Sequence, residues 1–254
     1  TYLWYTTPAR TTSSVSNLGA GTYVVSVTDS KGCTATATAF VSNPNLFRND
    51  SLQEWAANYF GEHQDAAVAI QVDDFIYVAG YTTDVSNGKD YLLVKYDLSG
   101  EEVWSNTYNG PGNGDDEVTA LALDTSGNIY ITGSSIGSGT GKDYATLKYN
   151  EDGTLAWTSR YNGSSNTTDI ARAITINNYT MVVVTGYITE TTTGKNFGTI
   201  SYSTSSGSQQ WLKTYTGLNS SSVDEASSIA PDGNNYLYVS GRSTGAIGRD
   251  KVII

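Results

Sequence analysis

A five-residue phrase occurs four times in this chain, and each copy ends in glycine. Every copy places three strand-forming residues and one small residue before the glycine, and successive glycines lie 53, 53 and 55 residues apart. These glycines are Gly80, Gly133, Gly186 and Gly241. A period of about 40 to 50 residues built from short strands is typical of units that cannot bury both faces alone. The repeat therefore predicts an all-β fold in which like sheets stack around an axis, a β-propeller.

The composition argues against two classes of partner. The net charge of −11 and the sequence pI of about 4.4 repel phosphate backbones, so no nucleic acid is expected. The apolar runs have strand length, far below the roughly 20 residues that a transmembrane helix needs.

Charged residues make up only 15% of the chain, whereas Gly, Ser, Thr, Asn and Tyr abound, a balance typical of secreted β-proteins. Because no initiating Met or signal-like segment is present, we expect Thr1 to be an internal position of a longer polypeptide.

The second copy of the repeat shows the strand pattern most clearly. We expect strands over 117–123, 129–134, 144–149 and 155–161. Asp, Asn and Gly between the runs favour tight hairpins, since these residues tolerate turn geometry. The pattern predicts four-stranded antiparallel blades, about four of them in this segment.

Two kinds of residue recur at fixed places in the blades. The first strands share a column of small residues, Ala69, Ala120, Ala173 and Ser228. The fourth strands carry a Trp and a Tyr four residues apart, namely Trp55 and Tyr59, Trp104 and Tyr108, Trp157 and Tyr161, and Trp211 and Tyr215. Because inner strands crowd at the axis and outer edges are wide, we expect the small residues at the hub and the aromatic pairs at the periphery.

The strand count leaves two ways to complete the ring. Copies 65–110, 116–163 and 169–217 are complete, whereas the last copy stops after its third strand at 250–254. An isolated fourth strand, 54–60, precedes them and would complete the last blade in a ring of four, which removes exposed sheet edges. We favour the alternative, in which further blades follow in a larger ring, because both termini look truncated.

Residues 1–45 do not share the repeat. Alternation and β-branched residues predict strands over 2–6, 21–28 and 34–41, with a hairpin turn at 29–32. Three strands are too few for an immunoglobulin-like sandwich of about seven strands, so we expect the carboxyl-terminal part of such a domain. We assign 46–52 to a linker and 53–254 to the propeller repeats. Cys33, the single cysteine, is either a buried free thiol or the partner of a residue outside this segment.

Two families resemble parts of this chain. The phrase from Asn17 to Thr36 resembles the carboxyl half of the SprB repeat, found in giant surface proteins of gliding Bacteroidota. The later residues are similar to the SBBP family of β-propeller repeats, through the strings 65–73, 76–80 and 90–96 and the following Trp104. The last two copies depart from that pattern, with Asn196 in place of Asp and Pro231 interrupting a first strand. The resemblance implies a large exported surface protein, with the type IX secretion machinery as its export partner.

Acidic residues form two columns in the repeat. Asp65, Asp116, Asp169 and Asp224 open the first strands, and Asp90, Asp143, Asn196 and Asp250 open the third strands. Gathered at one rim, such oxygen ligands suit Ca²⁺. The alternative that we favour is capping of backbone N–H groups at turns, because a group present in every blade serves a need of every blade. We therefore predict no cofactor, with Ca²⁺ left open.

A basic residue follows a glycine before each residue of the second column. These residues are Lys89, Lys142, Lys195 and Arg249. They suit an acidic glycan or a carboxylate on one face, or they pair locally with neighbouring acids. The candidate ligand-binding residues are therefore Lys89, Asp90, Lys142, Asp143, Lys195, Arg249, Asp250 and Asp116.

Catalysis has little support in this sequence. His63 is the only histidine, no Gly-x-Ser-x-Gly elbow is present, and Cys/His metal sites are excluded by count. Variable loops on a rigid scaffold favour binding instead. We predict a non-enzymatic extracellular segment of a bacterial cell-surface protein that binds a surface glycan or a protein partner. The alternatives are a polysaccharide-active enzyme with acids from Asp65, Asp116 or Asp143, and a passive spacer in a surface filament.

Overall fold

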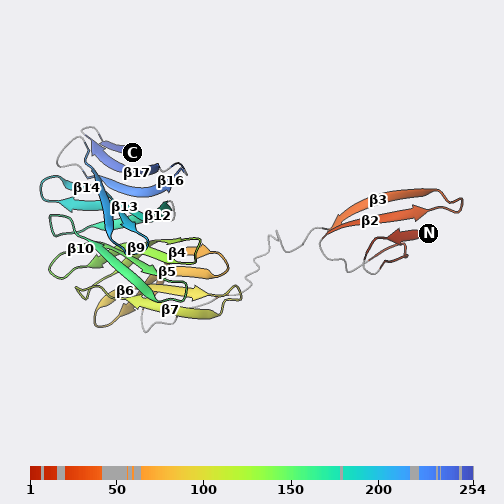
Figure 1. The fold of residues 1–254 in the computed structure, drawn as a ribbon, viewed down its shortest axis with the longest axis horizontal. Coiled ribbons are helices and arrows are strands. Elements are labelled where there is room, and N and C mark those ends of the chain that lie inside the picture. Colours follow the sequence, from red (N-terminus) through yellow and green to blue (C-terminus); the bar gives the residue numbers. More distant parts are fainter. Residues whose placement is uncertain are drawn as a thin grey trace. The chain divides into compact units, whose positions relative to one another are not determined.

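The computed structural model describes residues 1–6, 9–15, 21–41, 56, 59, 64–177, 180–217, 223–232, 234, 236–245 and 248–253. The chain divides into two compact units, Thr1–Ala56 and Ala57–Ile254. All elements of the described residues are strands, and the sheets are antiparallel (Figure 1). No helix in this part of the chain is long and apolar enough to cross a membrane.

The first unit is a three-stranded sheet. Its strands are β1 (Tyr2–Trp4), β2 (Gly21–Thr28) and β3 (Thr34–Val41), in the order β1-β2-β3. The three predicted strands are confirmed, although β1 ends at Trp4. The β2–β3 turn forms because Asp29 Oδ1 accepts the N–H groups of Lys31 and Cys33 at 2.8 and 2.9 Å, and Gly32 takes a φ of 85°. Cys33 is exposed, which excludes a buried thiol, one of the two alternatives for this residue.

The described residues of the second unit form four successive sheets, each an antiparallel meander. Sheet I consists of β4 (Ala66–Val72), β5 (Ile76–Asp84), β6 (Gly88–Tyr96) and β7 (Glu102–Tyr108). Sheet II consists of β8 (Glu117–Leu123), β9 (Ile129–Ile136), β10 (Lys142–Tyr149) and β11 (Leu155–Tyr161). Sheet III consists of β12 (Ile170–Asn177), β13 (Met181–Glu190), β14 (Gly194–Ser203) and β15 (Gln209–Tyr215). Sheet IV consists, among the described residues, of β16 (Glu225–Pro231), β17 (Leu237–Gly245) and β18 (Gly248–Ile253).

The repeated glycine faces a bulge in the first strand of its own sheet. In sheet II the register shifts between Val118 and Ala120, which turns the carbonyl of Glu117 toward Gly133. A Cβ atom on Gly133 would overlap that carbonyl oxygen. The same overlap with a first-strand carbonyl applies to Gly80, Gly186 and Gly241. The glycine therefore recurs because the bulge recurs.

The sheets stack in chain order and bury their faces against one another. The first strands of consecutive sheets are in contact, β4 with β8, β8 with β12 and β12 with β16. Between sheets I and II lies a cluster of Tyr77, Ala79, Tyr91, Leu93, Val118, Leu121, Ile129, Ile131, Ala145, Leu147 and Tyr149. Near the hub, Thr119 Oγ1 donates to the carbonyl of Ala171 at 2.7 Å and joins sheets II and III.

Tryptophans of the fourth strands join neighbouring sheets at the outer edge of the stack. Trp104 Nε1 donates to the carbonyl of Glu151 at 3.3 Å, and Trp157 Nε1 donates to that of Thr204 at 3.1 Å. Both acceptors lie in the turn between the third and fourth strands of the next sheet. Trp104 and Trp157 therefore have equivalent surroundings, as their equivalent places in the repeat predict.

The two ends of the repeat differ in part from the sequence-based expectations. Pro231 is the last residue of β16 and does not interrupt it, since a strand end tolerates the missing N–H. The isolated strand expected over 54–60 lies outside the described residues, except for Ala56 and Tyr59. Tyr59 packs against Ile76, Leu92, Val94 and Tyr96 of sheet I. Strand alternation places this cluster on the opposite face from the one that meets sheet II.

Candidate functional site

The acidic and basic columns meet at one end of the stacked sheets, which we call the rim. It is formed by the second-to-third strand hairpins and by the connections between sheets, which share one end of an antiparallel meander. In each connection, the backbone N–H of the aspartate of the first column donates a hydrogen bond to the preceding sheet. The pairs are Asp116 N to Lys89 O at 2.6 Å, Asp169 N to Lys142 O at 2.6 Å, and Asp224 N to Lys195 O at 2.9 Å.

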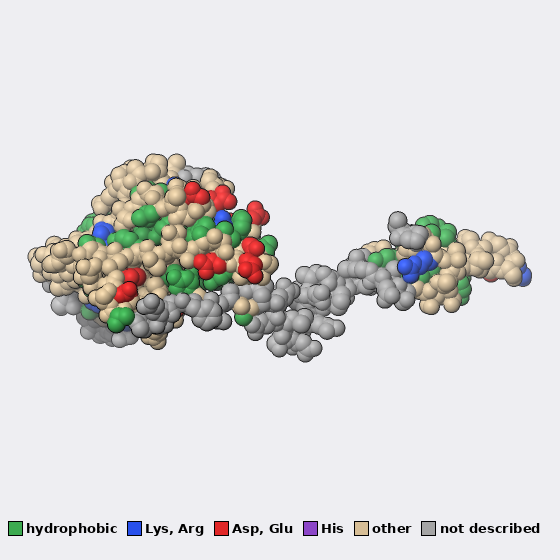
Figure 2. Space-filling model, turned by 90° about the horizontal axis from the view of Figure 1, so that it is seen from below, with side chains coloured by type: hydrophobic (Ala, Val, Ile, Leu, Met, Phe, Trp, Pro, Cys, Tyr) green, Lys and Arg blue, Asp and Glu red, His purple; other side chains and the backbone are tan. Residues whose placement is uncertain are grey.

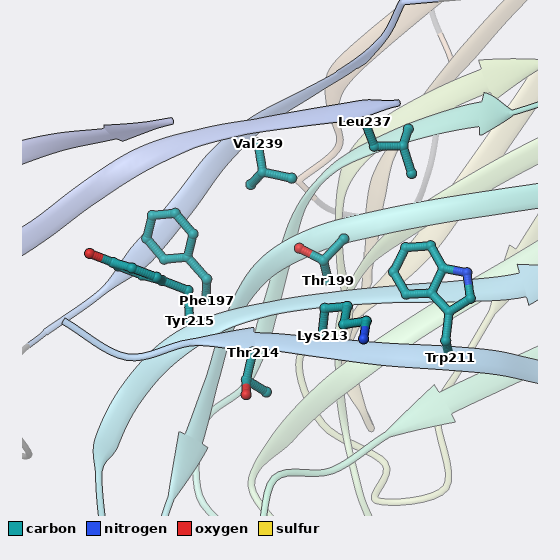
Figure 3. Close-up of a pocket in the computed structure, with 8 residues that line it drawn as sticks. All are labelled: Phe197, Thr199, Trp211, Lys213, Thr214, Tyr215, Leu237 and Val239. Atoms are coloured by element: carbon teal, nitrogen blue, oxygen red, sulfur yellow. The ribbon is translucent and has the colours of Figure 1, made fainter. Parts of the chain in front are cut away.

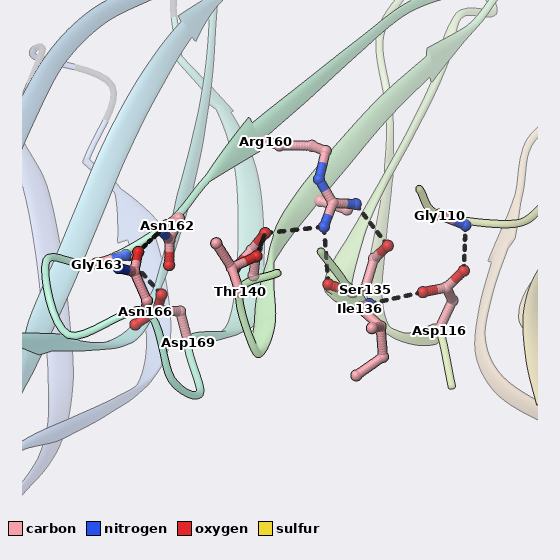
Figure 4. Close-up of polar contacts among 12 residues, drawn as sticks. Gly110, Asp116, Ser135, Ile136, Thr140, Arg160, Asn162, Gly163, Asn166 and Asp169 are labelled. Carbon is pink, nitrogen blue, oxygen red and sulfur yellow. Dashed lines mark hydrogen bonds and ion pairs between the residues drawn. The ribbon is translucent and has the colours of Figure 1, made fainter. Parts of the chain in front are cut away.

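The first acidic column fixes the connections onto the hairpins. Asp116 is fully buried, and its carboxylate accepts the N–H groups of Gly110 and, at 2.9 Å, Ile136 (Figure 4). Burial raises the pKa of Asp116, against the effect of these two donors. Asp224 is likewise buried and accepts the N–H of Gly217 at 2.7 Å and the hydroxyl of Ser243. These carboxylates therefore bind the chain's own groups.

Asp169 gives the rim a pH dependence that can be measured. Burial raises its pKa to about 6, although the N–H groups of Gly163 and Thr189 donate to it at 2.6 Å each. The folded state thus holds this proton more tightly than the unfolded state, so its contribution to the free energy of unfolding is largest below about pH 4. We expect this contribution to fall by about 2 kcal/mol as the pH rises to about 7.

The comparison of wild type with Asp169→Asn isolates this effect. As the pH rises from about 4 to 7, the free energy of unfolding in urea should fall for the wild type relative to Asp169→Asn. Asp152→Asn is the matched control, because Asp152 is exposed and the hydroxyl of Thr154 lowers its pKa. The control should show a shift of the opposite sign. A difference for Asp169→Asn that is constant with pH would contradict the assignment.

The three described side chains of the second column are also buried, and each pairs within its own hairpin. Asp90 accepts both contacts of Asn87 Nδ2, at 3.2 and 3.1 Å, and Asn196 Nδ2 donates to Thr193 Oγ1 at 2.6 Å. Asp143 accepts the hydroxyl of Thr140 at 2.9 Å. The side chains of Arg249 and Asp250 lie outside the described part, although their backbone belongs to β18.

Arg160 breaks the symmetry of the repeat. The equivalent positions of sheets I and III hold Thr107 and Thr214. The guanidinium donates to Asp143 Oδ2 at 3.0 Å, to the hydroxyl and carbonyl of Ser135 at 2.5 and 2.9 Å, and to the hydroxyl of Tyr108 at 3.2 Å (Figure 4). It therefore joins sheet I to sheet II, and its donors are occupied by the chain itself. The sequence analysis missed this role, and the available signal was an arginine where the other two copies have threonine.

The basic column forms shared ion pairs at the rim. Lys89 Nζ and Lys142 Nζ lie 2.6 Å from the two oxygens of Glu117, one on each side. Hydrogen bonds from Lys142 and, to a lesser extent, from Lys89 lower the pKa of Glu117. Lys195 and Arg242 share Glu225 in the same way. Each carboxylate thus lies between two cations, and each trio carries one net positive charge.

These carboxylates were missed in the sequence analysis. Glu117 and Glu225 directly follow an acid of the first column, whereas the other two copies have Ala66 and Ile170 at that place. The Asp-Glu pair was therefore the available signal. The cations remain partly exposed, with side-chain exposures of 28% for Lys89 and 35% for Lys195, so solvent reaches them.

An acidic cleft lies at the opposite end of sheets I and II. Its volume is about 640 Å³, and its lining includes Asp73, Asp74, Asp124 and Glu151. Figure 2 shows acidic side chains gathered on one face of the larger unit. Within the described ranges, no group of three or more His, Cys, Asp or Glu side chains is arranged to hold a metal ion. The cleft therefore supplies charge without a coordination site.

Three polar residues of the rim are closed to solvent, whereas its cations are partly exposed. Ser135, Asp116 and Asp143 are at most 4% exposed and bind groups of the chain itself, so a substrate in solvent does not reach them. His63 lies outside the described residues. The accessible charged groups include the cations around Glu117 and Glu225, which offer N–H donors to an anion, and the exposed carboxylates of Asp84 and Asp115. The prediction that the eight candidate residues bind a ligand stays a prediction.

One comparison with known proteins agrees with the repeat architecture. Residues 104–139 match the family model described as SBBP, a beta-propeller repeat. The chain therefore contains a β-propeller repeat, which spans the end of sheet I and the first two strands of sheet II. No curated protein matches the chain. Among solved structures, the subtype N11 neuraminidase-like protein of A/flat-faced bat/Peru/033/2010 (H18N11) is similar at 10% identity and a TM-score of 0.41, over 91% of this chain and 67% of that chain. A likeness this low carries no argument about chemistry.

Proposed function

We propose that this chain is a non-enzymatic binding segment of a large bacterial cell-surface protein, whose rim binds a carboxylate-bearing glycan or protein partner. The observation that carries the proposal is the pair of cation-rich trios at the rim. In each trio one carboxylate lies between two cations, and solvent reaches the cations. A protein with a net charge of −11 thus presents cationic N–H donors where its loops converge.

The burial of Asp116 and Asp143 argues against two of the three acids named in the enzyme alternative, whereas Asp65 is partly exposed. Glycoside cleavage needs two carboxyl groups that flank the scissile bond. Asp116 is 0% exposed and Asp143 is 4% exposed, and both are hydrogen-bonded to the chain. They stabilise the rim and are out of reach of a polysaccharide.

The wider setting belongs to the same proposal. Export to the cell surface by type IX secretion and a role in adhesion or gliding rest on the resemblance of 17–36 and of the later repeats to surface-protein families. The composition is rich in polar residues and has only 15% charged residues, which supports an extracellular location. We further propose that sheets I to IV are blades of one propeller and that the first unit is part of an immunoglobulin-like domain.

An acidic glycan array tests the proposed function directly. The double variant Lys89→Gln/Lys142→Gln removes both cations around Glu117, and we expect its affinity for carboxylate-bearing glycans to fall about tenfold or more. Its stability should change by less than about 1 kcal/mol, because these pairs are partly exposed. Lys31→Gln, an exposed lysine of the first unit, is the matched control and should bind like the wild type.

Two outcomes would contradict the proposal. Hydrolysis of a polysaccharide that is lost in a folded Asp116→Asn variant would identify an enzyme. Absence of any bound glycan or surface protein, with wild type and double variant alike, would identify a spacer.

A further inference from the structure

The two cation-rich trios of the rim differ in the acids beside them. At the first trio, the carboxylate of Asp115 accepts the backbone N–H of Lys89 at 3.1 Å, and Asp115 is exposed. Two carboxylates, those of Asp115 and Glu117, therefore lie beside the two lysines. At the second trio, Val223 holds the place of Asp115, directly before an acid of the first column. The second trio thus has one neighbouring acid fewer.

An arginine adds a third cation to the second trio. Arg172 forms the bulge of β12, between Ala171 and Ala173. Its Cζ lies 5.9 Å from the ring centroid of Tyr187, and Lys195 Nζ lies 4.0 Å from the same centroid. The ring attracts both cations, so it brings them to one place where sheets III and IV meet.

The charges at this place do not cancel. We call it the arginine cluster, and it consists of Arg172, Lys195, Arg242 and Glu225. Glu225 forms ion pairs with Lys195 and Arg242, whereas Arg172 is exposed and pairs with no described carboxylate. The arginine cluster therefore carries two net positive charges. The nearby stretches of sequence outside the described residues, 218–222 and 246–247, contain no acid.

Glu190, an acid at the same end of sheet III, faces the other way. Its carboxylate accepts the hydroxyl of Ser164, in the connection from sheet II. Ile188, two residues earlier on β13, is buried in the core between sheets II and III. Because alternate residues of a strand share a face, Glu190 faces sheet II, and Tyr187 lies on the opposite face with the cations. Glu190 therefore does not pair with the arginine cluster.

Both arginines break the symmetry of the repeat. The positions equivalent to Arg172 hold Val68, Thr119 and Ser227. The positions equivalent to Arg242 hold Tyr81, Ser134 and Tyr187. A need of every sheet would place a cation in every copy. The repeat fold therefore does not require these arginines, which favours a role in binding.

Two carboxylates on adjacent sugars match the arginine cluster. The planar fork of a guanidinium binds a carboxylate through two parallel N–H donors. Two net positive charges neutralise two such groups. The exposed neighbours on β16, which contacts β12, are Ser227 and Ser228. Their hydroxyls suit the hydroxyls of a sugar, whereas the centre of a protein interface is enriched in aromatic and apolar side chains.

We propose that the arginine cluster binds a polyuronate, an acidic glycan that carries a carboxylate on each sugar. One carboxylate takes the donors of Arg172, and the carboxylate of the next sugar takes those of Arg242 and Lys195. Arg172 is thus a specificity-determining residue that selects two adjacent carboxylates over one. This inference rests on the proposed function, because it names the glycan class that the rim binds and the part of the rim that binds it.

Digalacturonate, which has two carboxylates, is the probe, and the full chain is titrated with it by isothermal titration calorimetry. We expect it to bind about tenfold or more tightly than galacturonate, which has one carboxylate. Arg172→Gln should remove most of this advantage, and Arg172→Lys, which keeps the charge, should restore part of it. An unchanged near-ultraviolet circular dichroism spectrum shows that each variant is folded.

Lys213→Gln is the matched control, because it removes one exposed cation from the same sheet. Figure 3 shows Lys213 on β15, beside a groove of about 260 Å³ between sheets III and IV. The described lining of that groove contains no residue of the arginine cluster. Lys213→Gln should bind digalacturonate within about twofold of the wild type. Equal effects of Arg172→Gln and Lys213→Gln would overturn the inference.

The remaining outcomes separate this inference from the proposed function. If Lys89→Gln/Lys142→Gln weakens digalacturonate binding and Arg172→Gln does not, the inference fails and the proposed function stands. The same holds if digalacturonate does not bind but another carboxylate-bearing glycan does, or if a triglutamate peptide binds more tightly than digalacturonate. Absence of binding to any carboxylate-bearing glycan or protein would overturn both.

Discussion

Replacing Gly186 by alanine is expected to destabilise the larger unit by about 3 kcal/mol, measured by urea unfolding. The added Cβ would overlap the carbonyl oxygen of Ile170 and lie 2.9 Å from Cα of Ala171, both backbone atoms. It would also come within 2.8 Å of the hydroxyl of Tyr144, a fully buried side chain that donates to the carbonyl of Gly198. Neither the bulge nor the tyrosine can move without loss of buried contacts.

Gly139→Ala is the matched control for this variant. Gly139 has a φ of 82°, but no atom lies within 4 Å of an added Cβ. Its cost should be only the conformational one, about 1 kcal/mol. If Gly186→Ala were as stable as Gly139→Ala, steric exclusion at the bulge would not explain the repeated glycine.

Trp157→Ala is expected to cost about 3 to 5 kcal/mol in the free energy of unfolding. The side chain is 9% exposed and packs in the core between sheets II and III. Its ring centroid lies 6.0 Å from that of Tyr130 and 6.5 Å from that of Tyr202, and its indole N–H bonds the next sheet. The variant loses both the buried area and a tie between two sheets.

Trp211→Ala provides the comparison at the equivalent position. Trp211 lines a groove that is open between sheets III and IV, so its removal should cost less than half as much. Urea unfolding of both variants under the same conditions gives the ratio. Equal losses would show that the two tryptophans have equivalent surroundings and would contradict the description of the groove.

Much of the local structure of sheet II was predictable from the sequence. The first and fourth strands were predicted at 117–123 and 155–161, as observed, because alternation and turn residues are local signals. The second and third strands extend two residues further toward the rim, to Ile136 and from Lys142. The added residues, 135–136 and 142–143, lie beside glycine-rich and polar residues that do not favour strands. They form strands because they pair with each other, and this pairing overrides the local preference.

The contacts between sheets were less predictable. Buried Asp116 caps backbone N–H groups of a connection and a hairpin, which fits the capping interpretation of the acidic columns. The network of Arg160 and the ion pairs of Glu117 were missed, because both join residues from different copies of the repeat. A period in sequence fixes which positions are equivalent within each copy. It does not tell which side chains of adjacent copies meet.

The central claim is that consecutive copies stack as sheets and bring their basic and acidic columns together at one rim. Zero-length carbodiimide cross-linking of the native protein, followed by peptide mass spectrometry, tests it most directly. We expect amide links between Lys89 and Glu117 and between Lys195 and Glu225, whose charged atoms lie 2.6 and 3.2 Å apart across sheet boundaries. Links found only within single copies of the repeat, with none between consecutive copies, would contradict the account.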